Sequence, residues 1–169
     1  MPARFGRYPL YKDFNVTRLT KTAAIAAAAI AFIASASPAA AQNAGLTANS
    51  GEISLESGFT PDPYRVSLVS GGGIDGGQLP GACVGMISDA PDFELTYDSS
   101  GGPLSFRTQS GGDTTLIING PDGNWYCDDD SGGGVNARVT FSSAPSGTYD
   151  IWVGAIGDGA ATTLLITEL

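Results

Sequence analysis

The sequence contains no histidine, only two cysteines and few basic side chains. Of its 169 residues, 17 are acidic and 8 are basic. Without histidine, the chain cannot form a Ser-His-Asp or Cys-His catalytic site, nor a zinc site with histidine ligands. The excess of acidic residues also excludes nucleic acid as a partner that is bound through phosphate contacts.

The few basic residues are concentrated at the start of the chain. Five of the eight precede residue 22, whereas from Gln42 onward there are 16 acidic residues and three arginines, a net charge of −13. The basic segment is followed by an apolar run at 23–34 and by the small residues Ala39 and Ala41, which is the order found in a secretory signal peptide. The run is shorter than the roughly 20 residues that a membrane-spanning helix needs. We therefore predict a signal peptide over 1–41 that is cleaved after Ala41, with an uncleaved membrane anchor as the alternative.

The predicted compartment and domain plan follow from this signal. The protein is expected to be exported, to the periplasm or to the outside of the cell, with no membrane association after cleavage. Residues 42–51 are expected to form a flexible N-terminal segment. Residues 52–169 are long enough for one domain with its own core.

The pattern of apolar residues in this domain predicts strands. Short runs of period two are separated by clusters of Gly, Pro, Asp and Ser, which is typical of an all-β protein. The predicted fold is an antiparallel β-sandwich with jelly-roll-like connections. The expected strands cover residues 52–57, 64–70, 83–88, 93–97, 104–109, 114–119, 124–128, 138–141, 149–154 and 163–167.

Most aromatic residues are interpreted as part of the sandwich core. Trp152 is the exception, because it alternates with Tyr149, Ile151 and Val153 and so falls on the opposite face of its strand. Trp152 and Tyr126 are therefore the candidates for exposed aromatic residues that bind an extracellular surface.

The two cysteines, Cys83 and Cys127, are expected to form a disulfide, because the protein is predicted to enter an oxidising compartment. The bond would close a loop of roughly 44 residues and contribute about 4 kcal/mol in the chain-entropy model. Two free thiols are the alternative.

A predicted hairpin brings acidic residues together. The Gly-Pro-Asp-Gly sequence at 120–123 is a turn signal between two strand-like runs. If Leu116 lies opposite Cys127 and faces the core with it, Asp113 lies opposite Asp130. A different turn type would shift this register by one residue and still bring Asp113 to the acidic run at 128–130.

Carboxylates that share one face repel each other by roughly 3 kcal/mol per pair at about 5 Å. A divalent cation would remove this cost, and oxygen ligands without histidine match Ca²⁺ best. We therefore predict a Ca²⁺ site, with a solvated acidic loop as the alternative; the predicted ligands are Asp113, Asp128, Asp129 and Asp130. A second acidic group, formed by Asp89, Asp92 and Glu94, is interpreted as a solvated turn.

The same region resembles the bacterial pre-peptidase C-terminal domain family. The matching features are Asp113 with Leu116, the turn at 121–123, the run at 129–131 and the segment 147–149 that leads into the strand with Ile151 and Val153. The resemblance implies a secreted β-sandwich that accompanies extracellular hydrolases. In that family some members bind Ca²⁺ and some bind insoluble polymers, and the residues that carry over are Asp113, Asp129 and Asp130.

Three functions are compatible with these features. The first is a secreted, non-catalytic accessory module, stabilised by Ca²⁺, that binds an extracellular protein or polysaccharide surface. The second is a structural protein of the envelope or matrix that assembles with itself through sheet edges. The third, more remote, is a hydrolase that uses paired carboxylates such as Asp113 and Asp130.

Overall fold

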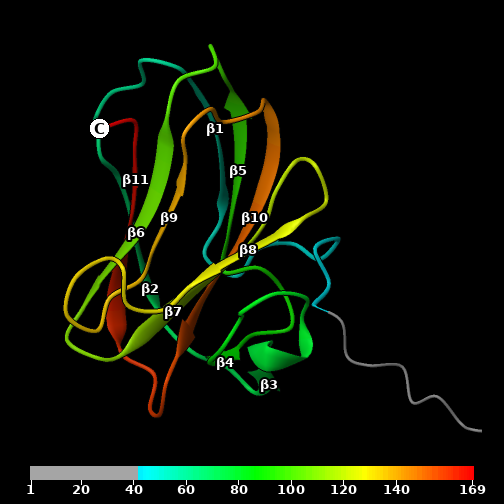
Figure 1. Ribbon diagram of the computed structural model, residues 1–169, viewed down its shortest axis with the longest axis vertical. Helices are drawn as coiled ribbons and strands as arrows, with labels where there is room; N and C mark the ends of the chain where they lie inside the picture. The colour runs from blue at the N-terminus through cyan, green and yellow to red at the C-terminus, as the bar shows by residue number, and fades with distance from the viewer. Residues whose placement is uncertain (1–41) are drawn as a thin grey trace, which may run out of the picture. The chain divides into compact units, whose positions relative to one another are not determined.

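The computed structural model describes residues 42–169 (Figure 1). The predicted signal peptide and its cleavage site lie outside the described residues. Within 42–169, no helix has the length and apolar character needed to cross a membrane. The regular structure of this part consists of strands and one short 3-10 helix, η1 (Gly76–Gln78), which confirms the predicted all-β sandwich.

The larger sheet, sheet A, has seven strands. Its central strand is β10 (Gly147–Ala155), which pairs on one side with β5 (Phe93–Asp98) and, at Ala155, with β4 (Met86–Ile87). On its other side β10 pairs with β7 (Thr114–Asn119), which pairs in turn with β8 (Trp125–Asp128). The sheet is completed by β1 (Glu52–Glu56), which runs parallel to β5, and by β3 (Ile74–Asp75), which pairs with β4. The parallel β1 is the departure from a purely antiparallel sandwich.

The smaller sheet, sheet B, has four antiparallel strands. Their order is β2 (Tyr64–Val69), β11 (Ala161–Thr167), β6 (Leu104–Ser110) and β9 (Arg138–Phe141). In Figure 1 these strands lie beside the long strands of sheet A, while β3, β4 and η1 gather at one end of the domain. The second sheet completes the two-layer architecture.

The main core lies between the two sheets. Alternate residues of the longer strands point into it, as in β11, where Leu164 and Ile166 are fully buried while Thr163 and Leu165 are only partly so. Each fully buried aliphatic or aromatic side chain contributes about 1.5–3 kcal/mol relative to an exposed one. The members with an exposed fraction of 0% are Leu95, Leu104, Phe106, Leu116, Ile118, Ala137, Tyr149, Ile151, Val153, Leu164 and Ile166.

A second, smaller core covers the outer face of sheet A. Leu79, Cys83 and Ile87 come from the segment between β2 and β5 and pack on Ile117 and Trp152. The disulfide between Cys83 and Cys127 is present, as predicted, and ties this segment to β8. The segment thus forms a partial third layer that one covalent bond holds in place.

This layer corrects two expectations. Trp152 does point away from the main core, but its exposed fraction is 0% because the covering segment buries it, so the prediction of an exposed aromatic residue was wrong there. Residues 83–88 were expected to form one strand, but only Met86–Ile87 does so. This two-residue strand pairs with β3 and, through Met86, with Ala155 of β10. The apolar residues of this segment reflect burial against Trp152 and not a long strand.

The segment at 42–51 also differs from the expectation that it is flexible. Backbone hydrogen bonds join Asn49 to Pro91 and Ser50 to Asp92, at 2.8 and 2.7 Å. Gln42 and Ala48 are buried. The segment therefore packs as part of the domain, because its backbone groups pair with the stretch that precedes β5.

Candidate metal centre

The hairpin of β7 and β8 sets the position of the acidic residues. Gly123 has a φ of +74° and closes a three-residue loop, in which Gly120 and Asn124 pair by a hydrogen bond of 2.9 Å. A left-handed third residue is the usual geometry for a hairpin loop of this length. Asp122 strengthens the turn, because its carboxylate accepts hydrogen bonds from the Asn124 backbone nitrogen at 3.1 Å and from the Tyr126 hydroxyl at 2.6 Å.

This loop shifts the register by one residue from the predicted pairing. Leu116 lies opposite Asp128 and Ile117 lies opposite Cys127. The prediction that Cys127 faces the main core was therefore wrong: Cys127 belongs to the outer face with Trp125, while Tyr126 packs against the main core. The shift is the one that the sequence left open, and it follows from the left-handed Gly123.

Asp128, one of the four predicted ligands, has another role. Its carboxylate accepts hydrogen bonds from the Ser131 backbone nitrogen at 3.0 Å, from the Ser131 hydroxyl at 2.7 Å and from the Arg138 backbone nitrogen at 2.6 Å. These contacts join the end of β8 to the start of β9. Asp128 thus holds the loop in shape, and the structure does not bring it into the group that could hold a metal ion.

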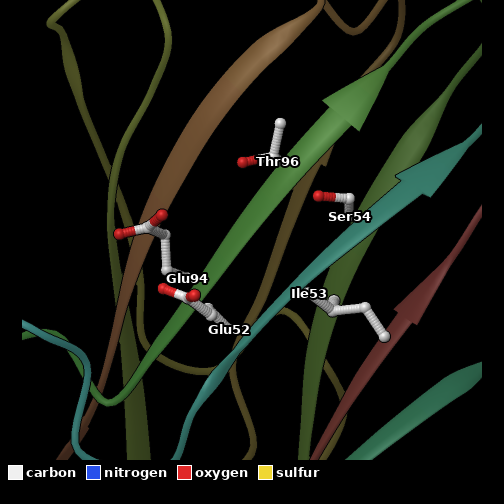
Figure 2. Close-up of a pocket in the computed structure, with 5 residues that line it drawn as sticks. All are labelled: Glu52, Ile53, Ser54, Glu94 and Thr96. Carbon is white, nitrogen blue, oxygen red and sulfur yellow. The ribbon is translucent and has the colours of Figure 1, made fainter.

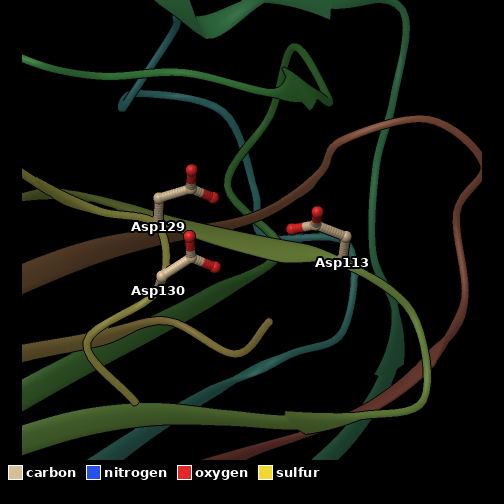
Figure 3. A group of neighbouring side chains, drawn as sticks. All are labelled: Asp113, Asp129 and Asp130. Atoms are coloured by element: carbon tan, nitrogen blue, oxygen red, sulfur yellow. The ribbon is translucent and has the colours of Figure 1, made fainter. Parts of the chain in front are cut away.

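The other three predicted ligands come together. Asp113 immediately precedes β7, and Asp129 and Asp130 immediately follow β8, so that the hairpin places them at the same end. One carboxylate oxygen of each lies within 4.8 Å of the others. Figure 3 shows the side chains of Asp129 and Asp130 next to each other, with that of Asp113 pointing toward them from the opposite side. We call these three residues the Asp113 cluster.

Among residues 42–169, no basic group offsets the negative charge around Asp129 in the Asp113 cluster. Burial raises the pKa of Asp129, and the nearby charges of Asp130, Asp113 and Asp128 raise it further. The Oδ1 atoms of Asp113 and Asp129 are buried and accept no hydrogen bond from residues 42–169. A buried polar atom without a partner costs free energy, about 1–3 kcal/mol, and more if it is charged.

A bound cation would satisfy these atoms. Ca²⁺ takes six to eight oxygen ligands, carboxylate oxygens among them, and water can supply the remainder. The exposed side of the cluster, at Asp130, leaves room for such water. The donor set of three carboxylates and no nitrogen or sulfur therefore fits a hard divalent cation.

A second group of carboxylates lies on the outer face of sheet A, away from the Asp113 cluster. Glu52 on β1 pairs with Glu94 on β5, and Glu94 pairs with Asp150 on β10. Figure 2 shows Glu52 and Glu94 side by side at a hollow that Ser54 and Thr96 also line. Asp150 is 7% exposed, and burial raises its pKa to about 6, with a further contribution from the charge of Glu94.

The acidic turn predicted to be solvated contains a buried carboxylate. Asp92 is only 5% exposed, and burial raises its pKa to about 6 although Val153, Ser88 and Asn49 donate hydrogen bonds that act against the rise. The interpretation of Asp92 as a solvated residue was therefore wrong. The local sequence could not reveal this, because the partner Val153 is 61 residues away.

Comparison with known proteins does not identify a family. No family model matches the chain, and no curated protein sequence matches it. A solved structure found to be similar is that of PliG from Aeromonas hydrophila, a periplasmic inhibitor of g-type lysozyme. It is 12% identical, the match covers 69% of this chain and 96% of PliG, and the TM-score is 0.32.

Proposed function

We propose that the protein is an exported, non-catalytic binding module of the pre-peptidase C-terminal type, in which the Asp113 cluster holds Ca²⁺. The observation that carries the metal assignment is the pair of buried, unpartnered oxygens, Asp113 Oδ1 and Asp129 Oδ1, in a group of three converging carboxylates. The signal-like start of the chain and the resemblance at 113–153 support the assignment as an exported accessory module.

In this proposal Ca²⁺ stabilises the hairpin. The cation would join the residue before β7 to the two residues after β8, at the end opposite the turn at 120–123. It would bind the folded state only, because the three carboxylates converge only when the hairpin has formed. A ligand at 100 times its dissociation constant then adds about 2.7 kcal/mol to the free energy of unfolding.

The test is a thermal melt in Ca²⁺ and in EDTA. The melting temperature of the wild-type protein is expected to rise by several degrees in millimolar Ca²⁺. Asp130→Ala should abolish the rise, whereas Glu56→Gln, which removes a carboxylate from an exposed position on β1, should keep it. Asp129→Asn should abolish the rise too, and in EDTA it should melt above the wild type because it removes repulsion. A wild-type melt that does not respond to Ca²⁺, or a full response in Asp130→Ala, would reject the site.

Self-assembly is the alternative function. Sheet A ends in the edge strand β1, where Glu52 and Glu56 occupy exposed alternate positions. Charged residues on an edge strand oppose pairing between edges, so this feature favours the binding module. Light scattering after size-exclusion chromatography, with and without Ca²⁺, separates the two: a Ca²⁺-dependent oligomer would favour assembly, and a monomer in both conditions would favour the module.

We also propose that the Asp113 cluster has no hydrolytic role. Of its members, Asp130 is exposed to solvent, whereas a catalytic acid commonly needs an apolar neighbour to raise its pKa. Incubation with a panel of polysaccharides checks this, since release of reducing ends by the wild type but not by Asp130→Ala would assign a hydrolase.

A further inference from the structure

All three arginines that follow residue 41 lie in one row across sheet B. Arg65 on β2 pairs with Leu165 on β11, Leu165 pairs with Arg107 on β6, and Arg107 pairs with Arg138 on β9. The row therefore crosses all four strands of the sheet, at a spacing of about 4.8 Å per strand. We call Arg65, Arg107 and Arg138 the arginine row.

Apart from Val69, Ala161 and Leu165, the strand positions on this outer face are polar, and none is acidic. The three arginines are exposed, and the outward positions around them carry hydroxyl and amide groups, as at Thr140 and Thr163. Within residues 42–169, no outward position of a sheet B strand holds Asp or Glu. In a segment that carries 16 acidic residues, this face is thus the one to which every cationic side chain is confined.

A hollow of about 260 Å³ lies at one end of the row. Arg107 and Arg138 line it, together with the hydroxyl-bearing residues Ser105, Thr140 and Thr167. Glu168 also lines it and adds one negative charge at its side, where the carboxylate is held by hydrogen bonds from the Gly58 backbone nitrogen at 2.8 Å and from the Tyr97 hydroxyl. The hollow therefore combines two guanidinium groups with the hydroxyl groups of Thr140 and Thr167, while Ser105 is buried and its hydroxyl pairs with that of Thr140. Leu169 also lines it.

Arg107 and Arg138 are like charges at directly opposite positions of neighbouring strands. Such a pair destabilises a sheet, and an anion between the two groups would turn the repulsion into charge-assisted hydrogen bonds. The acidic residues of sheet A do not cancel the attraction between an anion and these two arginines. The two sheets are about 10 Å apart, so outward side chains on opposite faces are separated by more than the Debye length of about 10 Å at 0.1 M salt.

The composition of the face indicates which anionic partner it fits. Protein interfaces have aromatic or aliphatic anchors at their centre, and the outward positions of these strands hold no aromatic residue, only Val69, Ala161 and Leu165 as apolar ones. Three arginines are also fewer than the six to ten phosphate contacts that are typical of nucleic-acid binding. A polymer with spaced anionic groups and many hydroxyls matches a row of arginines among Ser and Thr.

We propose that the arginine row is a binding site for the carboxylate or sulfate groups of an acidic polysaccharide. The inference rests on the proposed function as a binding module and names the surface that does the binding. Arg107 and Arg138 hold one anionic group at the hollow, and Arg65 contacts another group further along the polymer. Recognition is electrostatic, so it weakens as salt rises.

Affinity electrophoresis of the purified protein tests the proposal. Polygalacturonate and dextran sulfate distinguish the carboxylate from the sulfate source, and uncharged dextran is the neutral probe. EDTA is present throughout, so that Ca²⁺ cannot bridge the acidic protein to the acidic polymer. Retardation by at least one acidic polymer, none by dextran, and loss of retardation at high salt are expected. No retardation by either acidic polymer, or equal retardation by dextran, would overturn the proposal.

The variants separate the arginine row from general charge effects. Arg107→Gln with Arg138→Gln should weaken binding roughly tenfold or more, because each change removes charge-assisted hydrogen bonds. The matched control is Ser54→Glu with Thr96→Glu, which makes the same change in net charge on the outer face of sheet A and should bind like the wild type. Equal weakening in both double variants would reject the row.

The outcome is independent of the metal site. A double arginine variant that loses polymer binding but keeps its melting response to Ca²⁺ would support both proposals. A protein that fails to bind any polymer but responds to Ca²⁺ would reject the arginine row and leave the metal site standing. The remaining outcome is that the wild type instead forms a dimer or larger assembly that is lost in the arginine variants. That result would show that the row binds a second copy of this acidic chain, and it would also reject the proposal.

Discussion

The carboxylate of Asp92 accepts a hydrogen bond from the backbone nitrogen of Val153 at 2.7 Å. Val153 lies in the stretch of β10 between its pairing with β5, which ends at Ile151, and its pairing with β4 at Ala155. Asp92 thus takes the place of a strand at a gap in sheet A. Ser88 donates to the other carboxylate oxygen at 3.1 Å, which fixes the side chain from the second side.

Asp92→Ala is expected to destabilise the fold. The change leaves the buried Val153 nitrogen without an acceptor, which costs about 1–3 kcal/mol. Asp92→Asn keeps an acceptor oxygen and should cost less. Urea denaturation measures both, and equal loss of stability in the two variants would show that the hydrogen bond to Val153 is not the cause.

The buried carboxylates predict an unusual dependence of stability on pH. Burial raises the pKa of both Asp92 and Asp150 from 3.8 to about 6. Because the folded state then holds these protons more tightly than the unfolded state, the free energy of unfolding should rise as pH falls from 7 through 6 toward 4. Denaturation at pH 7.5 and pH 5, in EDTA, tests the direction.

Asp150→Asn isolates one of the two groups. The variant has no charge to bury and should be more stable than the wild type at pH 7.5, by on the order of 1–3 kcal/mol. Its gain in stability between pH 7.5 and 5 should be smaller than that of the wild type. Asp98→Asn, which also removes one carboxylate but at an exposed position on β5, is the control.

The disulfide is expected to hold the covering segment over Trp152. Replacement of both cysteines, as Cys83→Ser with Cys127→Ser, should lower the free energy of unfolding by about 4 kcal/mol in the chain-entropy model. Trp152 fluorescence should shift to longer wavelength as the segment loosens.

In the exported wild type, no thiol should be titratable under denaturing, non-reducing conditions. Two titratable thiols would contradict the disulfide between Cys83 and Cys127.

Gly72 is expected to be intolerant of a side chain. A Cβ atom there would lie 2.1 Å from the backbone carbonyl carbon of Ile87, which cannot move aside without displacing β4. Gly72→Ala should therefore lower stability, with a cost of roughly 1–3 kcal/mol or more. The neighbouring Gly73 offers a matched control, because its Cβ would meet nothing within 4 Å. Equal melting temperatures for the two alanine variants would contradict this packing.

The sequence predicts the sandwich well because its strands are marked by local signals. Alternation such as that around Leu164 and Ile166 is set by the pleat of a single strand, and the Gly-rich breaks mark the turns. The prediction of a strand over 83–88 was wrong because it relied on the same local signals. The apolar residues of this segment are buried by a distant Trp152, and no local pattern distinguishes that burial from a strand.

The candidate metal site likewise has features that the local sequence predicts and features that it does not. Asp113, Asp129 and Asp130 are close because one hairpin connects them, so the sequence alone predicts the cluster. The role of Asp128 depends on its contacts with Ser131 and Arg138, which the sequence pattern does not reveal. The register of the hairpin depends on the backbone conformation of Gly123, which the sequence pattern does not reveal either. The arginine row was not predicted at all, because Arg65, Arg107 and Arg138 become neighbours only through strand pairings between distant parts of the chain.

The separation of charge between the two sheets gives the domain a permanent electric dipole across its thickness. The negative end is the face with Glu52, Glu94 and Asp150, and the positive end is the face with the arginine row. A charged surface exerts a torque on such a molecule before contact. The domain would therefore turn sheet B toward an anionic surface while still diffusing, so that encounters begin in one orientation.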